Sequence, residues 1–392
     1  MEKNKNISFI QLESYTRPEI KESQRFDYVE YGDDNNYFEY LIDLYSDSAT
    51  NNAIINSAIQ IIYGDGIAAK NENTGDWDKF IEMVKPEDLR KIVSDFKMLG
   101  MCSFQVTYTP KRDKVLKMEH FPVNTLRAET ANDDGEIEAY YYAFDWENVR
   151  RMDDVTRIPA FGFGSGKDTE ILYIKPYIPS YFYYAPVDYH GCLQYCQLEA
   201  ELSNFHINNV LNGFMPAALI NMNNGEPESD EAKRDIERKI QQKFSGTSNA
   251  GKFILSFNDS KETAAEIVPV NLADAHSQYD YVSTEAKEKI ITAHRVTSPK
   301  LLGITDASGF SSNADEIIVA AMHYEKTVLE PFRRMIIGGI NLVQEINGTD
   351  FELYFKSLYE PKEDVEEDVA DIKDEAEEAV DVEQQEQNKD VI

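Results

Sequence analysis

The sequence predicts an α+β fold, and three observations lead to this prediction. Apolar residues with helical spacing fill residues 37–99, and glycines end the helical stretches. Alternating residues typical of strands follow, beginning at Ser103–Tyr108. Residues 188–342 then read as helix, small insert, helix, loop and long helix. No catalytic constellation accompanies this order, so we expect function to follow from the arrangement of the elements.

Composition places the chain among globular proteins and excludes several classes. The chain has 392 residues, enough for two or three domains, and its 42% apolar content excludes full disorder. A formal net charge of −32 argues against an ordinary DNA-binding module, because such modules neutralise phosphates with Lys and Arg. No run of about 18 apolar residues occurs and Met1–Asn6 lacks an apolar signal core, so we expect a soluble protein without a membrane span.

The first half is expected to hold helices followed by strands. Residues 1–30 are polar with scattered aromatics and predict an N-terminal arm with little structure of its own. Two helices follow, over about 35–45 and 53–62, and Gly64-Asp65-Gly66 ends the second. The other elements predicted here are helices at Trp77–Met83 and Leu89–Leu99 and strands at Ser103–Tyr108, Tyr140–Phe144 and Glu170–Ile174.

The second half is expected to hold two long helices around a small insert. The first helix covers residues 188–213 and the second covers residues 274–298, each with a narrow apolar seam. The seams comprise Leu193, Cys196, Ala200, Ile207 and Leu211 in the first helix and Tyr279, Val282, Ala286, Ile290 and Ala293 in the second. The insert predicts strands at Ala217–Met222, Phe253–Phe257 and Glu266–Val270 and a charged helix at Asp230–Phe244.

The C-terminal quarter of the chain begins with a polar Gly/Ser loop. A long helix opens at Asn313, with Ser312 and Asp315 forming a capping-box pattern. Pro331 lies in its interior and predicts a kink, because proline removes a backbone donor. Beyond Tyr359 acidic residues dominate, so we expect a disordered tail over residues 361–392.

Two motifs invite an enzymatic interpretation, and neither supports one. Tyr31-Gly32-Asp33-Asp34 spells a metal-binding tetrapeptide of viral RNA polymerases, but the thirty residues before it cannot hold a palm domain. Gly162–Asp168 has three residues between its outer glycines, whereas a Walker loop needs four, followed by Lys and Ser or Thr. The six histidines are scattered and identify no catalytic pairing. We therefore expect a protein that is not an enzyme.

The three cysteines give no disulfide framework. Cys192 and Cys196 lie one helical turn apart, with His190 and His206 nearby in sequence, but a zinc site needs four tightly organised ligands. We interpret these cysteines as buried helix thiols and expect no metal or cofactor.

Four segments, in this order, resemble the portal proteins of tailed bacteriophages, the rings through which DNA enters and leaves the capsid. They are Tyr31–Asn35 with the helix pair ending at Gly64-Asp65-Gly66, Tyr181–Tyr189, Ser298–Gly303 and Ser311–Glu316. The resemblance covers about four fifths of the chain, residues 31–342, and is more specific in its order than in any single motif.

The resemblance implies a portal-like architecture. An α/β wing would take residues 31–187, a two-helix stem residues 188–213 and 274–298, and a small α/β clip residues 214–273. A tunnel loop and the long kinked wing helix would occupy residues 299–345. Many portal proteins carry a helical crown at the C-terminus. In this chain residues 346–360 would form only a short crown-like segment, so the crown is short or absent.

The resemblance also implies where DNA and partners are contacted. The tunnel loop would comprise Gly303, Ile304, Thr305, Asp306, Ala307, Ser308, Gly309, Phe310, Ser311 and Ser312. The basic residues expected to guide phosphates in the stem are Lys287, Lys289, Arg295 and Lys300. The clip residues expected to dock the packaging motor are Lys233, Arg234, Arg238, Lys239 and Lys243.

The implied partners are other copies of the chain in a ring of about twelve, the terminase large subunit, a head-tail adaptor, the major capsid or scaffold protein, and double-stranded DNA. The implied location is the portal vertex of the virion, with the host cytoplasm during assembly. Two alternatives stay open at this point: another ring-forming or scaffold-type virion protein and, more distantly, a metal-dependent nuclease or polymerase.

Overall fold

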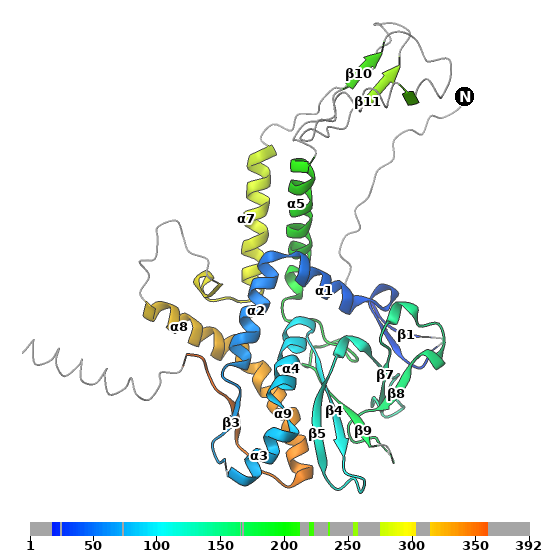
Figure 1. Cartoon of the computed structure of the whole chain (residues 1–392), viewed down its shortest axis with the longest axis vertical. Helices are drawn as coiled ribbons and strands as arrows, with labels where there is room; N and C mark the ends of the chain where they lie inside the picture. Colours follow the sequence, from blue (N-terminus) through cyan, green and yellow to red (C-terminus); the bar gives the residue numbers. More distant parts are fainter. Residues whose placement is uncertain are drawn as a thin grey trace, which may run out of the picture. The chain divides into compact units, whose positions relative to one another are not determined.

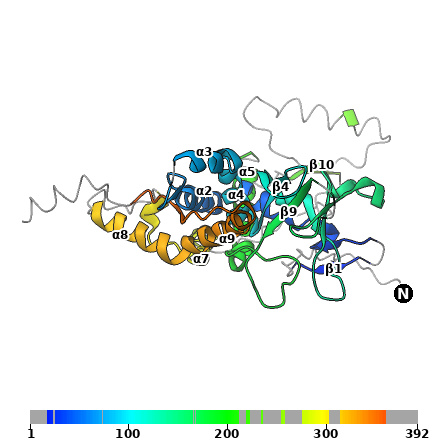
Figure 2. The same cartoon turned by 90° about the horizontal axis from the view of Figure 1, so that it is seen from below.

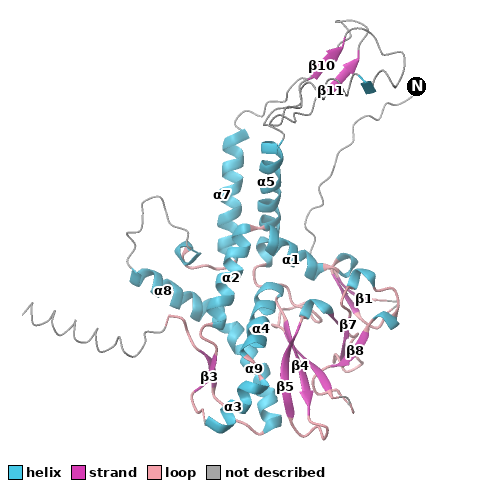
Figure 3. Cartoon of the chain, in the orientation of Figure 1, coloured by secondary structure: helices cyan, strands magenta, loops and turns pink. Residues whose placement is uncertain are grey.

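The structure is a computed structural model that describes residues 18–23, 26–72, 74–164, 166, 168–211, 219–222, 234–235, 254–257, 275–302 and 314–359. The chain divides into two compact units. Unit 1 comprises residues 1–16, 40–53 and 189–294, and unit 2 comprises residues 17–39, 54–188 and 295–392. Helices and strands both contribute, so the predicted α+β class is confirmed (Figure 3). Within the described ranges, no helix combines the length and the apolar character needed to cross a membrane.

The core of unit 2 is a three-stranded antiparallel sheet covered by helices. The strand order is β5 (Val115–Phe121), β4 (Cys102–Tyr108) and β9 (Thr169–Ile174). Helices α4 (Pro86–Leu99) and α9 (Glu330–Asn347) contact each other and the sheet (Figure 1), and the rings of Phe96 and Phe332 lie 5.0 Å apart. Helix α3 (Thr74–Met83) packs beside β5. These elements match the predicted helices and strands, except that β5 was not predicted.

Helix α4 begins and ends where its sequence dictates. Pro86 occupies its first turn, where a missing N–H costs nothing, and Gly100 ends it in the left-handed conformation with φ of 79°. Gly100 donates its N–H to the Phe96 carbonyl. The glycine also lies against Pro186 and Val187, which leaves little room for a side chain.

A second sheet in unit 2 holds the strands β6 (Leu126–Ala128), β7 (Ala139–Tyr142) and β8 (Thr156–Pro159). Nearby, β1 (Ile20–Glu22) pairs antiparallel with β2 (Val29–Tyr31). The N-terminal arm predicted over residues 1–30 is therefore partly wrong: its last third forms a strand pair whose Val29 and Tyr31 are fully buried. Residues 1–17 lie outside the described residues.

The long C-terminal helix is interrupted, as the sequence predicted, but by a wider turn just before the proline. Helix α8 (Ala314–Tyr324) and α9 are joined by a π-helical turn, Glu325–Leu329, and Pro331 lies in the first turn of α9. Figures 1 and 2 show this run as a continuous helix that changes direction between α8 and α9. The missing N–H of proline breaks the regular hydrogen-bond ladder, and a π turn accommodates the break.

The segment after α9 completes the core of unit 2. Strand β12 (Leu353–Phe355) pairs antiparallel with β3 (Ile67–Ala69), and Phe351 and Phe355 are buried. Phe351 and Phe355 belong to the hydrophobic core of unit 2, and the crown-like segment expected over residues 346–360 stays a prediction. The acidic stretch 361–392 lies outside the described residues.

Unit 1 contains a pair of long helices and a small strand pair. Helix α5 (Leu193–Leu211) follows a 3-10 turn at His190–Cys192, and α7 spans Ala275–Ala293. The unit also takes the second part of α1 (Tyr37–Asp47) and the first turn of α2 (Ala49–Tyr63). Within the insert, β10 (Leu219–Met222) pairs with β11 (Ile254–Phe257) in parallel, at two of the predicted strands.

The structure describes only part of the remaining elements predicted for the insert. Of the helix expected at Asp230–Phe244, Arg234 and Asp235 are described and are helical. The strand expected at Glu266–Val270 lies outside the described residues. The second long helix ends at Ala293 and not at residue 298, because Arg295 adopts a left-handed conformation with φ of 57° and Pro299 opens a separate 3-10 turn.

We predict that Gly64→Ala destabilises unit 2 strongly. The φ of Gly64 is +56°, and an added Cβ would lie 1.8 Å from the Lys356 carbonyl oxygen of the neighbouring C-terminal segment. Left-handed strain and the backbone clash together should lower the free energy of unfolding by about 2–4 kcal/mol. The matched control is Gly338→Ala, where the new Cβ meets nothing within 4 Å and helix propensity should raise stability by up to about 1 kcal/mol. Equal melting temperatures for the two variants would contradict this account of Gly64.

Candidate functional site

The helix pair of unit 1 is the element with the clearest functional character. Helices α5 and α7 run side by side (Figure 1). Four members of the predicted seams are buried, namely Cys196 and Ala200 of α5 and Ala286 and Ile290 of α7. Further along, the rings of Phe205 and Tyr279 stack 4.8 Å apart.

Large apolar side chains remain on the outer faces of this pair. Ile207, a predicted seam residue, is 56% exposed, and Tyr281 is 66% exposed. The helix pair alone therefore does not cover Ile207, and its place in the seam stays a prediction. Because two helices in contact cover only one face of each other, these flanks have no other cover among the described residues of unit 1.

A carboxylate of α5 fixes the beginning of α2 within unit 1. Glu199 accepts hydrogen bonds from the Thr50 N–H at 3.1 Å and the Thr50 hydroxyl at 2.6 Å, and also from the Ser48 hydroxyl. The first turn of α2 carries no acidic residue of its own. Glu199 therefore supplies from another helix the negative charge that a helix N-terminus favours.

The end of α7 is held in the same unit by an aromatic and polar cluster. The buried His294 ring stacks on Tyr189 at 4.5 Å, and its Nε2 lies 2.9 Å from the Asn51 side-chain oxygen. Tyr189 precedes α5, so this cluster joins the residues that flank the helix pair in sequence.

Cys192 of the 3-10 turn and Cys196 of α5 are structural. Cys192 and Cys196 are buried, and their sulfur atoms lie 3.9 Å apart. Hydrogen bonding to Cys192 and burial both raise the pKa of the Cys196 thiol far above its usual value, so it stays protonated and a poor metal ligand. In the part of the chain that the structure describes, no cluster of His, Cys, Asp or Glu has the geometry of a metal site.

Within unit 2, the Asp188 carboxylate forms ion pairs with two basic residues. Its carboxylate oxygens lie 2.7 and 2.9 Å from the Lys97 Nζ atom, and Arg295 approaches at 3.1 Å. The Lys97 side chain is fully buried. Arg295 is thus ion-paired, although it was predicted to guide phosphates, and it lies beyond the end of α7.

The other predicted stem residues have different surroundings. On α7, Lys289 is exposed and Lys287 is half-buried, so both reach the surface of the helix pair in the single chain. Lys300 is half-buried in the 3-10 turn Pro299–Leu302 of unit 2. Lys287 and Lys289 thus belong to unit 1, and Arg295 and Lys300 belong to unit 2.

The predicted tunnel loop, Gly303–Ser312, lies outside the described residues. So do four of the predicted clip residues, namely Lys233, Arg238, Lys239 and Lys243. Arg234 is described and is exposed.

The glycine-rich stretch after β8 binds a carboxylate of its own chain. Glu170 of β9 is fully buried, and its carboxylate accepts the N–H groups of Gly162 at 2.9 Å and Gly164 at 3.1 Å. The same carboxylate accepts the Tyr108 hydroxyl at 2.8 Å and the Arg112 guanidinium. The backbone donors that resembled a phosphate-binding loop are therefore occupied by Glu170.

The acidic tetrapeptide near the N-terminus is part of a turn held by a buried arginine. Asn35 has φ of 59°, and its side-chain and backbone oxygens both accept hydrogen bonds from the Arg127 guanidinium. Arg127 is 2% exposed and lies over the Trp146 ring at 4.8 Å. This geometry gives Gly32-Asp33-Asp34 a conformational role at the entrance to α1.

Comparison with known proteins was carried out at the levels of sequence and structure. No protein-family model matches the chain, and no curated protein matches it. Among solved structures, a chain from the neck of an empty GTA particle, computed with C6 symmetry, is 14% identical with a TM-score of 0.55, over 84% of this chain and 87% of that chain. A chain from the virion of the native gene transfer agent (GTA) particle is 14% identical with a TM-score of 0.52, over 86% and 89%.

This chain has the fold of those gene transfer agent proteins. A crystal structure of an HK97-family phage portal protein from Corynebacterium diphtheriae also matches, with 11% identity and a TM-score of 0.44 over 76% of this chain and 89% of that one.

We predict that Glu199→Ala loosens the start of α2. Loss of the carboxylate leaves the Thr50 N–H without its acceptor and should cost about 1–2 kcal/mol. Faster amide hydrogen exchange at Thr50 and Asn51, with a lower melting temperature, would be the measured result. The control is Glu201→Ala on the exposed face of the same helix, which should change stability by less than about 0.5 kcal/mol. Unchanged exchange at Thr50 in Glu199→Ala would show that the cap is dispensable.

Proposed function

We propose that this chain is a phage portal protein, a ring-forming channel of the virus particle through which double-stranded DNA is packaged and ejected. The observation that carries the proposal is the fold shared with a chain from a gene transfer agent neck over 84% of this chain. The order of elements in the sequence, with two long helices around a small insert, supports the same conclusion.

Self-association is supported by the helix pair. Ile207 and Tyr281 leave apolar area on the flanks of α5 and α7, and a neighbouring copy on each side would cover it. A closed ring meets this need, because each copy then presents one flank to the next copy and the other flank to the previous one. The expected ring has about twelve copies.

The acidity of the chain suits a channel that does not hold DNA. About twelve copies with a formal charge of −32 each would carry on the order of −380 before counterions. Such a field repels phosphates and favours sliding over binding. Lys289 and Lys287 are the described basic residues of α7 that we assign to local contacts with passing phosphates.

The remaining roles follow from the same proposal. The clip, with Lys233, Arg234, Arg238, Lys239 and Lys243, would dock the terminase large subunit and later a head-tail adaptor. The wing would contact the major capsid or scaffold protein at one vertex of the virion, after assembly in the host cytoplasm. We assign no catalytic step to this chain, so ATP hydrolysis belongs to the motor.

The first test is the oligomeric state of the purified chain and of a loop deletion. Negative-stain imaging and native mass measurement should show rings of about a dozen copies with a central hole. Deleting residues 306–311 should leave the rings intact and reduce packaged or retained DNA, because the predicted tunnel loop would no longer reach the channel. A monomer that stays monomeric in the presence of capsid components, or a deletion with normal DNA content, would contradict the respective parts of the proposal.

A second prediction concerns motor docking. Substituting Arg234, Arg238 and Lys243 together by Glu reverses three charges of the predicted clip helix, so binding of the terminase large subunit should fall by about tenfold or more while rings still form. The matched control reverses Arg150, Arg151 and Lys117, which are exposed in unit 2. Equal terminase binding by both triple variants would remove the clip helix from the docking surface.

A further inference from the structure

A loop of unit 2 presents aromatic side chains from a stretch of sequence that contains no acidic residue. Residues 175–187, which follow β9, contain no Asp or Glu, in a chain where 71 of 392 residues are acidic. Within it, Tyr177 is 89% exposed and Phe182 is 52% exposed. A large ring exposed to this degree on an ordered loop is a typical anchor of a protein–protein interface.

The loop is built to hold these rings in place. The Lys175 ammonium donates to the Phe182 carbonyl across the base of the loop. At its tip, the Tyr181 N–H donates to the Ile178 carbonyl at 3.1 Å, and Ser180 has φ of 69°. Pro176 and Pro179 restrict the backbone further. A preformed loop loses little conformational entropy on docking, which favours binding.

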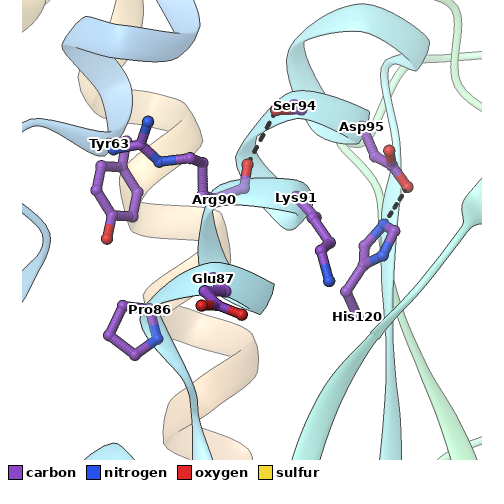
Figure 4. Close-up of a pocket in the computed structure, with 8 residues that line it drawn as sticks. All are labelled: Tyr63, Pro86, Glu87, Arg90, Lys91, Ser94, Asp95 and His120. Atoms are coloured by element: carbon purple, nitrogen blue, oxygen red, sulfur yellow. Dashed lines mark hydrogen bonds and ion pairs between the residues drawn. The ribbon is translucent and has the colours of Figure 1, made fainter.

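The same unit contains an open groove of about 650 Å³ that has the right lining for an aromatic ring. Figure 4 shows Tyr63 and Pro86 along one side, Asp95 and His120 along the other, and Arg90 and Lys91 on α4 between them. The Arg90 guanidinium lies 4.6 Å above the Tyr63 ring. An entering aromatic ring would meet a cation already oriented for stacking.

Charge favours the pairing of this loop with this groove. The groove balances Arg90 and Lys91 against Glu87 and Asp95, and the Asp95 carboxylate lies 2.8 Å from the His120 Nε2 atom. Copies with a net charge of −32 repel each other, so they approach at the least cost where the acidic excess is absent. Both the loop and the groove are such places.

Their positions also suit a head-to-tail contact. His120 belongs to β5, one edge strand of the sheet β5-β4-β9, whereas the loop follows β9, the other edge strand. A cyclic ring needs a heterologous interface, in which two different surfaces of each copy meet. The groove lies mainly on α4, with His120 of β5 on one side, and the loop follows the strand at the other edge of the sheet, so the two surfaces are different ones.

We propose that the loop 175–182 of one copy docks into the groove of the next copy, with the Tyr177 ring stacking on Arg90. This inference rests on the ring assembly proposed above. It names a contact between unit 2 of one copy and unit 2 of the next copy in that ring. Tyr177 is the anchor residue, and Arg90 is its receiving partner.

The first experiment compares ring assembly by variants of each side. Tyr177→Ala and Arg90→Ala should each raise the chain concentration for half-maximal ring formation by about tenfold or more, as loss of an interface anchor does. The matched control is Phe144→Ala, because Phe144 is 88% exposed in the same unit but lies at a different hollow. All three side chains are exposed, so the melting temperatures of the isolated chains should be unchanged.

The second experiment identifies the contact directly. The three native cysteines are buried, so a short bismaleimide will react with introduced ones. Rings co-assembled from Tyr177→Cys and Lys91→Cys chains should give a cross-linked dimer, whereas rings of either variant alone should not. Rings that combine Phe144→Cys with Lys91→Cys provide the control.

The outcomes separate the two proposals. If wild-type rings form and Tyr177→Ala assembles like the wild type, or if the mixed rings give no cross-linked dimer, the docking proposal is wrong and the ring proposal stands. If the wild-type chain forms no rings, the proposed function fails and the docking proposal fails with it. Cross-linking within rings of Tyr177→Cys alone would indicate a symmetric contact and would also overturn the proposal.

Discussion

The structure of unit 2 depends on the buried ion pair between Lys97 and Asp188. The chain leaves this unit after Asp188 and returns at Arg295, and the Asp188 carboxylate binds both Lys97 and Arg295. One carboxylate therefore holds together the two points between which the long helix pair is inserted. Lys97 is fully buried and lies 5.4 Å from the Phe332 ring, so removal of Asp188 would leave an uncompensated charge in the core, at a cost of about 3–5 kcal/mol.

Sequence periodicity predicted the elements whose apolar pattern is local, and it missed those whose partners are distant. Helices α1 to α5 and strands β4, β7 and β9 follow from spacing and from glycine or proline at their ends. Strand β12 has only three residues and is a strand because it pairs with β3, so its local sequence does not predict it. The Lys97–Asp188 pair joins residues 91 positions apart, and such a pairing cannot be read from composition.

The candidate site was predictable in outline and not in detail. The order of two helices around an insert indicated a portal-like chain. The individual basic residues, however, were assigned to phosphate contacts from their charge alone. Arg295 shows the limit of that approach, because its charge is used by Asp188 inside unit 2. The glycine-rich stretch shows the converse: its N–H donors are real, and Glu170, only a few residues further along, occupies them. The assignments at the tunnel loop and the clip stay predictions. Exposed rings such as Tyr177 and Tyr281 were missed, since exposure is a property of the fold.

The net charge constrains how copies of this chain can meet. Long-range repulsion between chains of −32 each opposes any ring, so the favourable terms must be short-ranged and concentrated where acidic residues are sparse. Two surfaces satisfy this condition: the loop after β9, which contains no acidic residue, and the apolar flanks of α5 and α7. Stacking of aromatic side chains and burial of apolar area are both insensitive to net charge. The acidic excess is then left to the remaining surface. In the proposed ring, higher salt would therefore weaken the repulsion between copies more than it weakens their short-ranged contacts, and it would promote assembly.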